Sequence, residues 1–309
     1  MHKYILKRIA LLLPVIIGVT FVVFTMLHFT PGDPARMALG EQAPQEAVDK
    51  LREDMGLNDP FLVQFGRYVY KAVVHQDLGR SYITKRSVVG EIMNVFPTTL
   101  KLAALSMVVA IIIGIPFGII SAIKQYSIFD STVMLFALVG ISMPVFWLGI
   151  LLILFFSVRL GWLPSSGFYS IKHMILPSIT LAAQAVAIIT RMTRSSMLEV
   201  VRQDFVRTAR AKGQKESIVI GKHALRNALI PIITVAGVQF GYLLGGAVLT
   251  EVIFSIPGVG RLMVESIKMR DYPIVQAGVL YIALACSFVN LLVDLLYAYV
   301  DPRIKAQYK

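Results

Sequence analysis

Six long apolar segments, separated by polar ones, dominate the hydrophobic pattern of this chain of 309 residues. A helix needs about 20 apolar residues to cross the hydrocarbon core of a bilayer, and five of the six segments meet that length. The segment 174–190 is marginal, at 17 residues. The pattern predicts an all-α membrane protein with six spans, at residues 9–29, 100–123, 132–158, 174–190, 229–250 and 274–299.

The segment 30–97 is the longest polar stretch, and it predicts a small helical insert between the first two spans. Apolar residues recur at helical spacing over residues 47–55, and Gly56 suits the end of that helix. A second apolar stripe follows over residues 61–73, with Asp59 as its N-cap. We expect two short amphipathic helices, which act either as a structural lid or as a docking surface for an external partner.

Lys and Arg are distributed unevenly over the connecting segments. The short segments 159–173 and 251–273 together carry five of them. Sixteen lie in the other set, which comprises residues 1–8, 124–131, 191–228 and 300–309. Because short cytoplasmic loops carry the excess of Lys and Arg, we expect both termini to be cytoplasmic and the insert to be extracytoplasmic. This bias explains the formal charge of +12 without a nucleic acid partner.

Motifs for catalysis are absent from the sequence. It contains no G-x-x-x-x-G-K-[ST] loop for a nucleotide, no H-E-x-x-H and no G-x-S-x-G. The five histidines are scattered without metal-ligand spacing, and Cys286 is the single cysteine. We therefore expect no enzymatic activity, metal site, disulfide or bound cofactor in this chain.

Helix-breaking and small residues mark two of the predicted spans. Pro144 lies inside the third span, where it removes a backbone donor and predicts a kink. Gly237, Gly241 and Gly245 recur every four residues in the fifth span and so share one helix face. Such a stripe favours a helix-packing seam over a wall of the translocation pathway, although either use suits small residues.

Asp294 places a carboxylate inside the sixth predicted span. A charge there is costly, so we expect it to have a partner, with Arg191 or Arg194 as the candidates. A buried structural pair is the favoured interpretation, and a gate element is the alternative.

The basic loop at residues 191–228 differs most from the lipid-like remainder of the chain. We expect the fourth helix to continue from Met192 to about Lys212 and to end at Gly213. A second short helix then leads back to the membrane at Pro231. The apolar edge of this amphipathic element suits either a groove on a partner or an anionic lipid surface. By helical spacing that edge comprises Met197, Leu198, Val201, Phe205 and Ala209.

Within this loop, DFVRTARAKG (204–213) and HALRNALIP (223–231) resemble the cytoplasmic EAA loop of ABC-importer permeases. The form is typical of the branch that carries dipeptides, oligopeptides, nickel and glutathione. Arg207 and Thr208 replace the Glu and first Ala of the general motif, and His223 and Arg226 replace its Ile and Pro. Further matching fragments follow in order along nearly the whole chain: PGDPA (31–35), GWLPSSG (161–167), EVIFSIPGVGRL (251–262), RDYPIVQ (270–276) and VDPRI (300–304).

The resemblance implies a type I ABC-importer permease domain over residues 1–309, located in the cell membrane. It implies a second, homologous permease subunit, two ATPase subunits that bind ATP and magnesium, and an extracytoplasmic substrate-binding protein as partners. The expected cargo is a short peptide, with a nickel chelate or glutathione as alternatives. The residues implied in coupling to the ATPase are Asp204, Phe205, Ala209, Arg210, Gly213 and His223.

Two other classes of function are alternatives to ATP-driven import. An ion-coupled secondary carrier needs an ion or proton site within the membrane and usually has repeated halves. A single intramembrane acid and the lack of a repeat in the sequence argue against that class. A membrane scaffold or sensor would use the basic loop to bind lipid or a regulator and would move no substrate.

Overall fold

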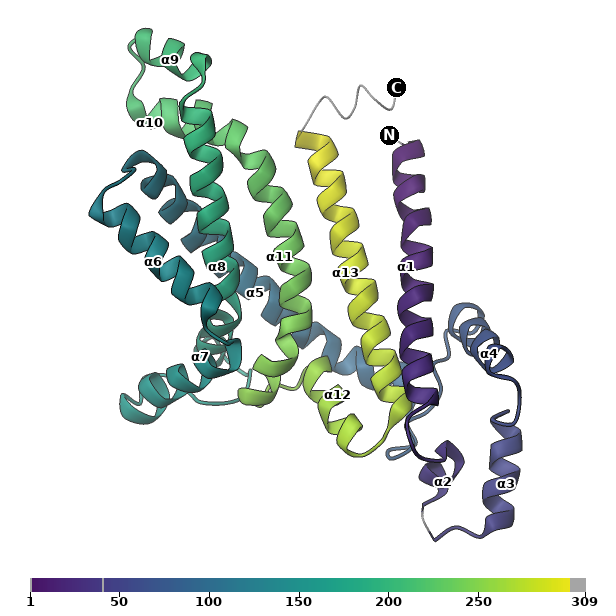
Figure 1. Cartoon of the computed structure of the whole chain (residues 1–309). Helices are drawn as coiled ribbons and strands as arrows, with labels where there is room; N and C mark the ends of the chain where they lie inside the picture. The colour runs from purple at the N-terminus through teal and green to yellow at the C-terminus, as the bar shows by residue number, and fades with distance from the viewer. Residues whose placement is uncertain (1, 41, 301–309) are drawn as a thin grey trace. The chain divides into compact units, whose positions relative to one another are not determined.

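The computed structural model describes residues 2–40 and 42–300, with the backbone alone at residues 2–9, 294 and 296–300. Its elements are helices, from α1 (His2–His28) to α13 (Tyr272–Val300) (Figure 1). Within the described part, strand-like pairing is limited to one isolated bridge between Arg80 and Ser87. The predicted all-α class is confirmed.

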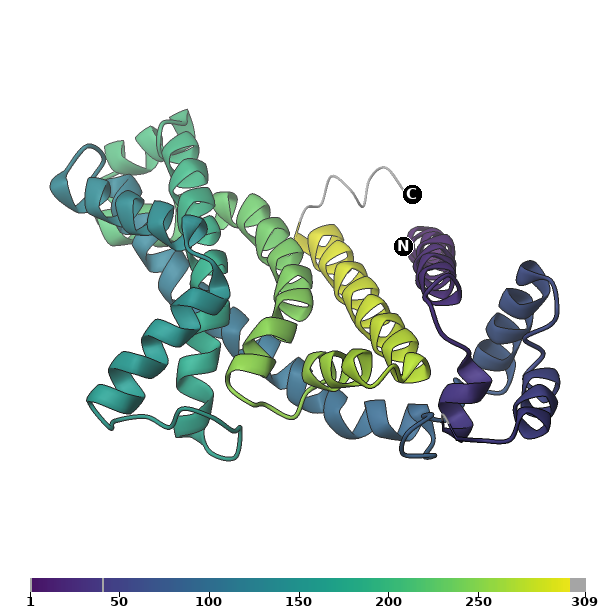
Figure 2. The same cartoon turned by 60° about the horizontal axis from the view of Figure 1, so that its bottom comes forward.

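Five helical stretches are long and apolar enough to cross a membrane. They are Ala10–His28 of α1, α5 (Val88–Ile123), α8 (Ile171–Val201), the run Glu216–Ile253 and Tyr272–Val293 of α13. A sixth candidate is a broken pair, with Ile128–Ser142 (α6) bent by 107° against Val145–Arg159 (Figure 2). The latter comprises α7 (Val145–Leu152) and the π-helix η1 (Ile153–Arg159). The expected third span is therefore not one helix over residues 132–158.

Pro144 explains the break between α6 and α7. The residue before a proline is pushed out of the helical region, and Met143 is extended, with φ −81° and ψ 126°. Pro144 then begins the next helix, because its carbonyl accepts from the N–H groups of Trp147 and Leu148 at 3.0 and 3.1 Å. The predicted disruption at Pro144 thus takes the form of a sharp turn.

The chain divides into two compact units, and the first centres on residues 99–256. Within it α8 is the central helix, and it packs against α6, α7 and α11 (Leu225–Ile253). More than half of its apolar window is buried. Small residues allow the backbones to approach closely: a Cβ atom on Gly118 of α5 would lie 2.5 Å from the side chain of Thr193.

The second unit comprises residues 10–98 and 257–285. Its core contains Leu78, Val88, Ile92, Val259, Ile274 and Ala277. The expected insert is helical, with α2 (Pro34–Leu39), α3 (Gln45–Asp54) and α4 (Phe61–Val74), and α12 (Val259–Lys268) completes the unit.

Two boundaries in this unit differ from the expectation. The second spanning helix begins at Val88 and so includes the end of the predicted insert. Pro60, not Asp59, is the N-cap of α4. The Asp59 carboxylate instead forms an ion pair with Arg67, in the second turn of that helix.

Candidate functional site

The basic loop is divided by a break that the sequence analysis missed. α8 ends at Val201, and α9 (Asp204–Ala211) begins three residues later. Gln203 between them is extended, with φ −77° and ψ 152°, and its carbonyl accepts from the N–H of Val206 at 3.1 Å. The prediction of one continuous helix from Met192 to Lys212 is therefore wrong.

The break changes which side chains of α9 are buried. Val206 is fully buried and Ala209 is 8% exposed, whereas Phe205 is 39% exposed. A continuous helix would have placed Phe205 on the buried edge. The buried residues belong to an apolar cluster that joins α9 to α5, α8, η2 (Val219–Ala224) and α11. This cluster comprises Ala122, Met197, Val200, Val206, Ala209, Val219, Ile220, Ala224, Ala228 and Ile232.

The opposite face of α9 is open to solvent. The side chains of Asp204 and Arg207 are 96% and 74% exposed, and their charged groups lie 3.7 Å apart. An ion pair this exposed contributes little to stability. α9 thus exposes an acid and a base on this face and, on its flank, a partly exposed aromatic ring.

Gly213 provides the turn that follows α9, as predicted. Its φ is +71°, in the left-handed region that glycine adopts without a steric penalty. A Cβ atom there would meet no described atom within 4 Å, so the backbone conformation, and not crowding, demands glycine.

Two polar contacts close the hairpin after this turn. Arg210 donates two hydrogen bonds to Glu216, at 2.7 and 3.1 Å, and these raise the pKa of the guanidinium. The His223 ring nitrogen Nε2 lies 2.8 Å from the amide oxygen of Gln214. We refer to residues 202–224 as the α9 hairpin. The expected second short helix is not separate, because α10 (Glu216–Ile218), η2 and α11 run on as one helical stretch.

An ion pair between a buried acid and a half-buried base lies near the base of the hairpin. Arg194 of α8 donates two hydrogen bonds to Asp130 of α6, at 2.6 and 2.7 Å. The pairing expected for Asp294, with Arg191 or Arg194, stays a prediction, because the side chain of Asp294 lies outside the described residues. The sequence offered one signal for Asp130, because Ser127 and Asp130 have the spacing of a capping box. In the structure the Asp130 N–H donates to the hydroxyl of Ser127, the N-cap of α6.

The glycine stripe of α11 makes close contact at one of its three positions. A Cβ atom on Gly237 would lie 2.2 Å from the side chain of Val293 in α13. At Gly241 and Gly245 the same atom would meet no described atom within 4 Å. Within this chain, helix packing accounts for Gly237 and leaves the other two positions open.

Most of the chain matches families of transport proteins. Residues 114–306 match the family described as "Binding-protein-dependent transport system inner membrane component". Residues 1–103 match the family described as "Binding-prot-dependent transport system membrane comp, N-term". The chain belongs to this class of membrane permeases.

Individual relatives cover the chain from end to end. The dipeptide transport system permease protein DppB of Alkalihalophilus pseudofirmus is 48% identical over 333 residues, with 99% of this chain and 100% of that protein covered. The glutathione transport system permease protein GsiC of Escherichia coli is 46% identical over 305 residues, with 99% of each chain covered.

The inward-facing MetNI methionine ABC transporter has the same fold, with a TM-score of 0.57 at 18% identity over 69% of this chain and 97% of that one. The chain is thus a multi-pass permease subunit of an ABC importer in the cell membrane. It is a transport component and not an enzyme, and neither relatives nor fold support a secondary carrier.

Proposed function

We propose that the α9 hairpin is the element through which separate ATPase subunits drive this permease. The observation that carries the proposal is the apolar cluster that packs α9 against α8 and α11. Because packed side chains cannot be compressed, a force on α9 passes directly to two membrane-spanning helices. The hairpin is then positioned to convert closure of an ATPase pair into rotation of the spans.

The exposed face of α9 supports contact with a protein groove. Phe205 offers an aromatic anchor, and the ion pair of Asp204 and Arg207 lies to one side of it. Arg210, Gly213 and His223 act on this surface indirectly, by fixing the shape of the hairpin. ATP and magnesium are held by two partner subunits, since this chain has no P-loop sequence.

The same proposal places the hairpin and both termini in the cytoplasm, with the insert facing an external substrate-binding protein. A second, homologous permease subunit completes the pathway. The cargo is a short peptide rather than a nickel chelate. Support comes from the relatives, whose names give dipeptide and glutathione, itself a tripeptide, as cargo.

Truncation of the exposed aromatic side chain tests the coupling. Phe205→Ala removes the proposed anchor and leaves the apolar cluster intact, since Phe205 is not part of it. Loss of such an anchor costs more than about 1.4 kcal/mol, so we expect at least a roughly tenfold loss of peptide-stimulated ATP hydrolysis. The measurement uses the full transporter in proteoliposomes with its binding protein and a dipeptide.

Ile171→Ala is the control, because Ile171 is 79% exposed at the other end of α8. It should leave both coupling and thermal stability unchanged. Full coupling in Phe205→Ala would contradict the proposed role of α9.

A further inference from the structure

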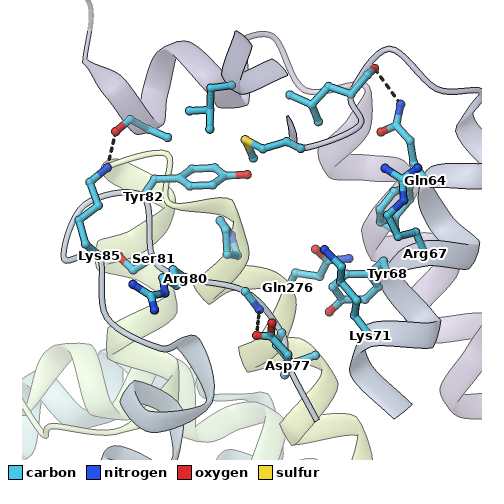
Figure 3. A pocket seen from close by; sticks show the side chains of 18 of the residues that line it. Gln64, Arg67, Tyr68, Lys71, Asp77, Arg80, Ser81, Tyr82, Lys85 and Gln276 are labelled. Carbon is cyan, nitrogen blue, oxygen red and sulfur yellow. Dashed lines mark hydrogen bonds between the residues drawn. The ribbon is translucent and has the colours of Figure 1, made fainter. Parts of the chain in front are cut away.

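The insert and the start of α13 surround a cavity of about 570 Å³. Small-molecule sites have volumes of about 300–1,000 Å³. Figure 3 shows side chains of α4 on one side of the cavity and those of the turn at residues 79–85 on the other, with Gln276 between them. All of the lining belongs to one compact unit.

Three hydrogen bonds hold the turn at residues 79–85 in place. Asp271 accepts from the Ser81 hydroxyl and, at 2.9 Å, from the Tyr82 N–H. The Lys85 ammonium donates to the Ala38 carbonyl. The wall of the cavity formed by this turn is therefore preorganised.

Basic side chains outnumber acidic ones in the lining, four to one. Arg67 and Lys85 already have partners within the insert. Lys71 and Arg80 have no ion-pair partner among the residues that the structure describes, and Figure 3 shows them on opposite sides of the cavity. The acid, Asp77, has one oxygen bound to a backbone N–H at 2.8 Å. The lining thus favours an anion.

Two polar atoms of lining residues are buried and unsatisfied. The Tyr68 hydroxyl and the Gln276 amide nitrogen have no hydrogen-bond partner among the described residues. Burial raises the pKa of Tyr68, so the phenol keeps its proton. Nearly all buried polar groups in proteins are partnered, so these two atoms are unusual, but they have almost no accessible surface and a ligand in the cavity does not reach them.

We propose that this cavity binds a small organic carboxylate with an apolar side group, about the size of a short peptide. The carboxylate lies toward Lys71 and Arg80, and the apolar group packs on the wall formed by Leu51, Met55 and Leu78. The site lies in the insert and does not depend on coupling through the α9 hairpin.

Two probes that differ only in the carboxylate test this site. N-acetyl-leucine and N-acetyl-leucinamide are titrated against the full chain in phosphatidylcholine nanodiscs, with binding followed by saturation-transfer NMR. We expect saturable binding of the acid and at least about tenfold weaker binding of the amide, because a charge-assisted contact is lost. Joint replacement of Lys71→Gln and Arg80→Gln should weaken binding of the acid by a similar factor. Lys50→Gln, an exposed lysine of α3 outside the lining, should not.

Tyr68→Phe is a second control, at a lining residue whose hydroxyl the ligand does not reach. It removes a buried hydroxyl that has no partner among the described residues, so thermal stability should stay level or rise and binding of the acid should be unchanged. Absence of saturation, or equal binding of both probes, would overturn the proposal. Binding that survives the double replacement would show that the ligand lies elsewhere, and it would overturn this inference. The proposal that the α9 hairpin couples to an ATPase would still stand.

Discussion

Asp130 receives four hydrogen bonds from three segments of the chain. Arg194 donates two, and the Ser121 hydroxyl and the Tyr126 N–H donate the others. The side chains of Asp130 and Arg194 are 5% and 23% exposed. Removal of one partner from such a pair is costly, because the other charge stays buried without compensation.

Asp130→Asn tests this contact, since it removes the charge and keeps the shape. We expect the free energy of unfolding to fall by about 3 kcal/mol, measured by titration with sodium dodecyl sulfate in mixed micelles. Ser121→Ala deletes a single hydrogen bond to the same carboxylate and should cost only about 1 kcal/mol. A loss below about 1 kcal/mol for Asp130→Asn would mean that the pair acts like an exposed ion pair.

Residue roles set by the local backbone could be predicted from the sequence, whereas those set by tertiary contacts could not. Gly56 and Gly213 both follow helices and have positive φ, as expected of glycine at a helix end. Asp130 and Arg194 are 64 positions apart, and no local rule links them. Their partnership follows from the packing of α6 against α8.

At the level of elements, the contact between α11 and α13 depends on the missing side chain of Gly237. Gly237→Ala would place a methyl group in the space of Val293, and overpacking of this kind costs about 1–3 kcal/mol. Val293→Ala in the same chain should recover most of that loss. Thermal unfolding of the isolated chain in detergent measures both.

Gly245→Ala is the matched substitution on the same helix, because its methyl group would meet no described atom within 4 Å. Alanine is a better helix former, so stability should be unchanged or higher by up to about 1 kcal/mol. Equal losses of stability in Gly237→Ala and Gly245→Ala would show that alanine destabilises α11 itself, and not the contact of α11 with α13.

The start of α9 shows why periodicity misassigned one side of the hairpin. Helical spacing assumes an unbroken helix, in which each residue advances by about 100° around the axis. One extended residue, Gln203, resets that count, so Val206 rather than Phe205 enters the apolar cluster. The amphipathic character of the element was predictable, but its register depended on a break that hydrophobicity does not mark.

For the whole molecule, the number and order of apolar segments were predictable, and the path of one of them was not. Five segments correspond to long helices, because apolar length determines membrane-spanning helices. The third contains α6 and α7 at 107° to each other. Its apolar composition continues through Met143 and Pro144, so hydropathy shows no boundary there. The proline predicted a disruption, but the angle depends on packing of both helices against α8.

Orientation in the membrane is the property on which every proposed partner depends. An ATPase can reach the α9 hairpin, and an external binding protein can reach the insert, only if the hairpin and the insert lie on opposite sides of the membrane.

In a Cys286→Ala background we therefore expect Lys50→Cys in α3 to react with an impermeant maleimide on intact spheroplasts. Lys215→Cys in the hairpin should react only in inside-out vesicles, because sixteen Lys or Arg lie in the segments assigned to the cytoplasm. Both lysines are exposed, so access through the membrane decides the result. Reaction of both from one side would be incompatible with coupling through the hairpin, since cargo receptor and ATPase would then have to share one compartment.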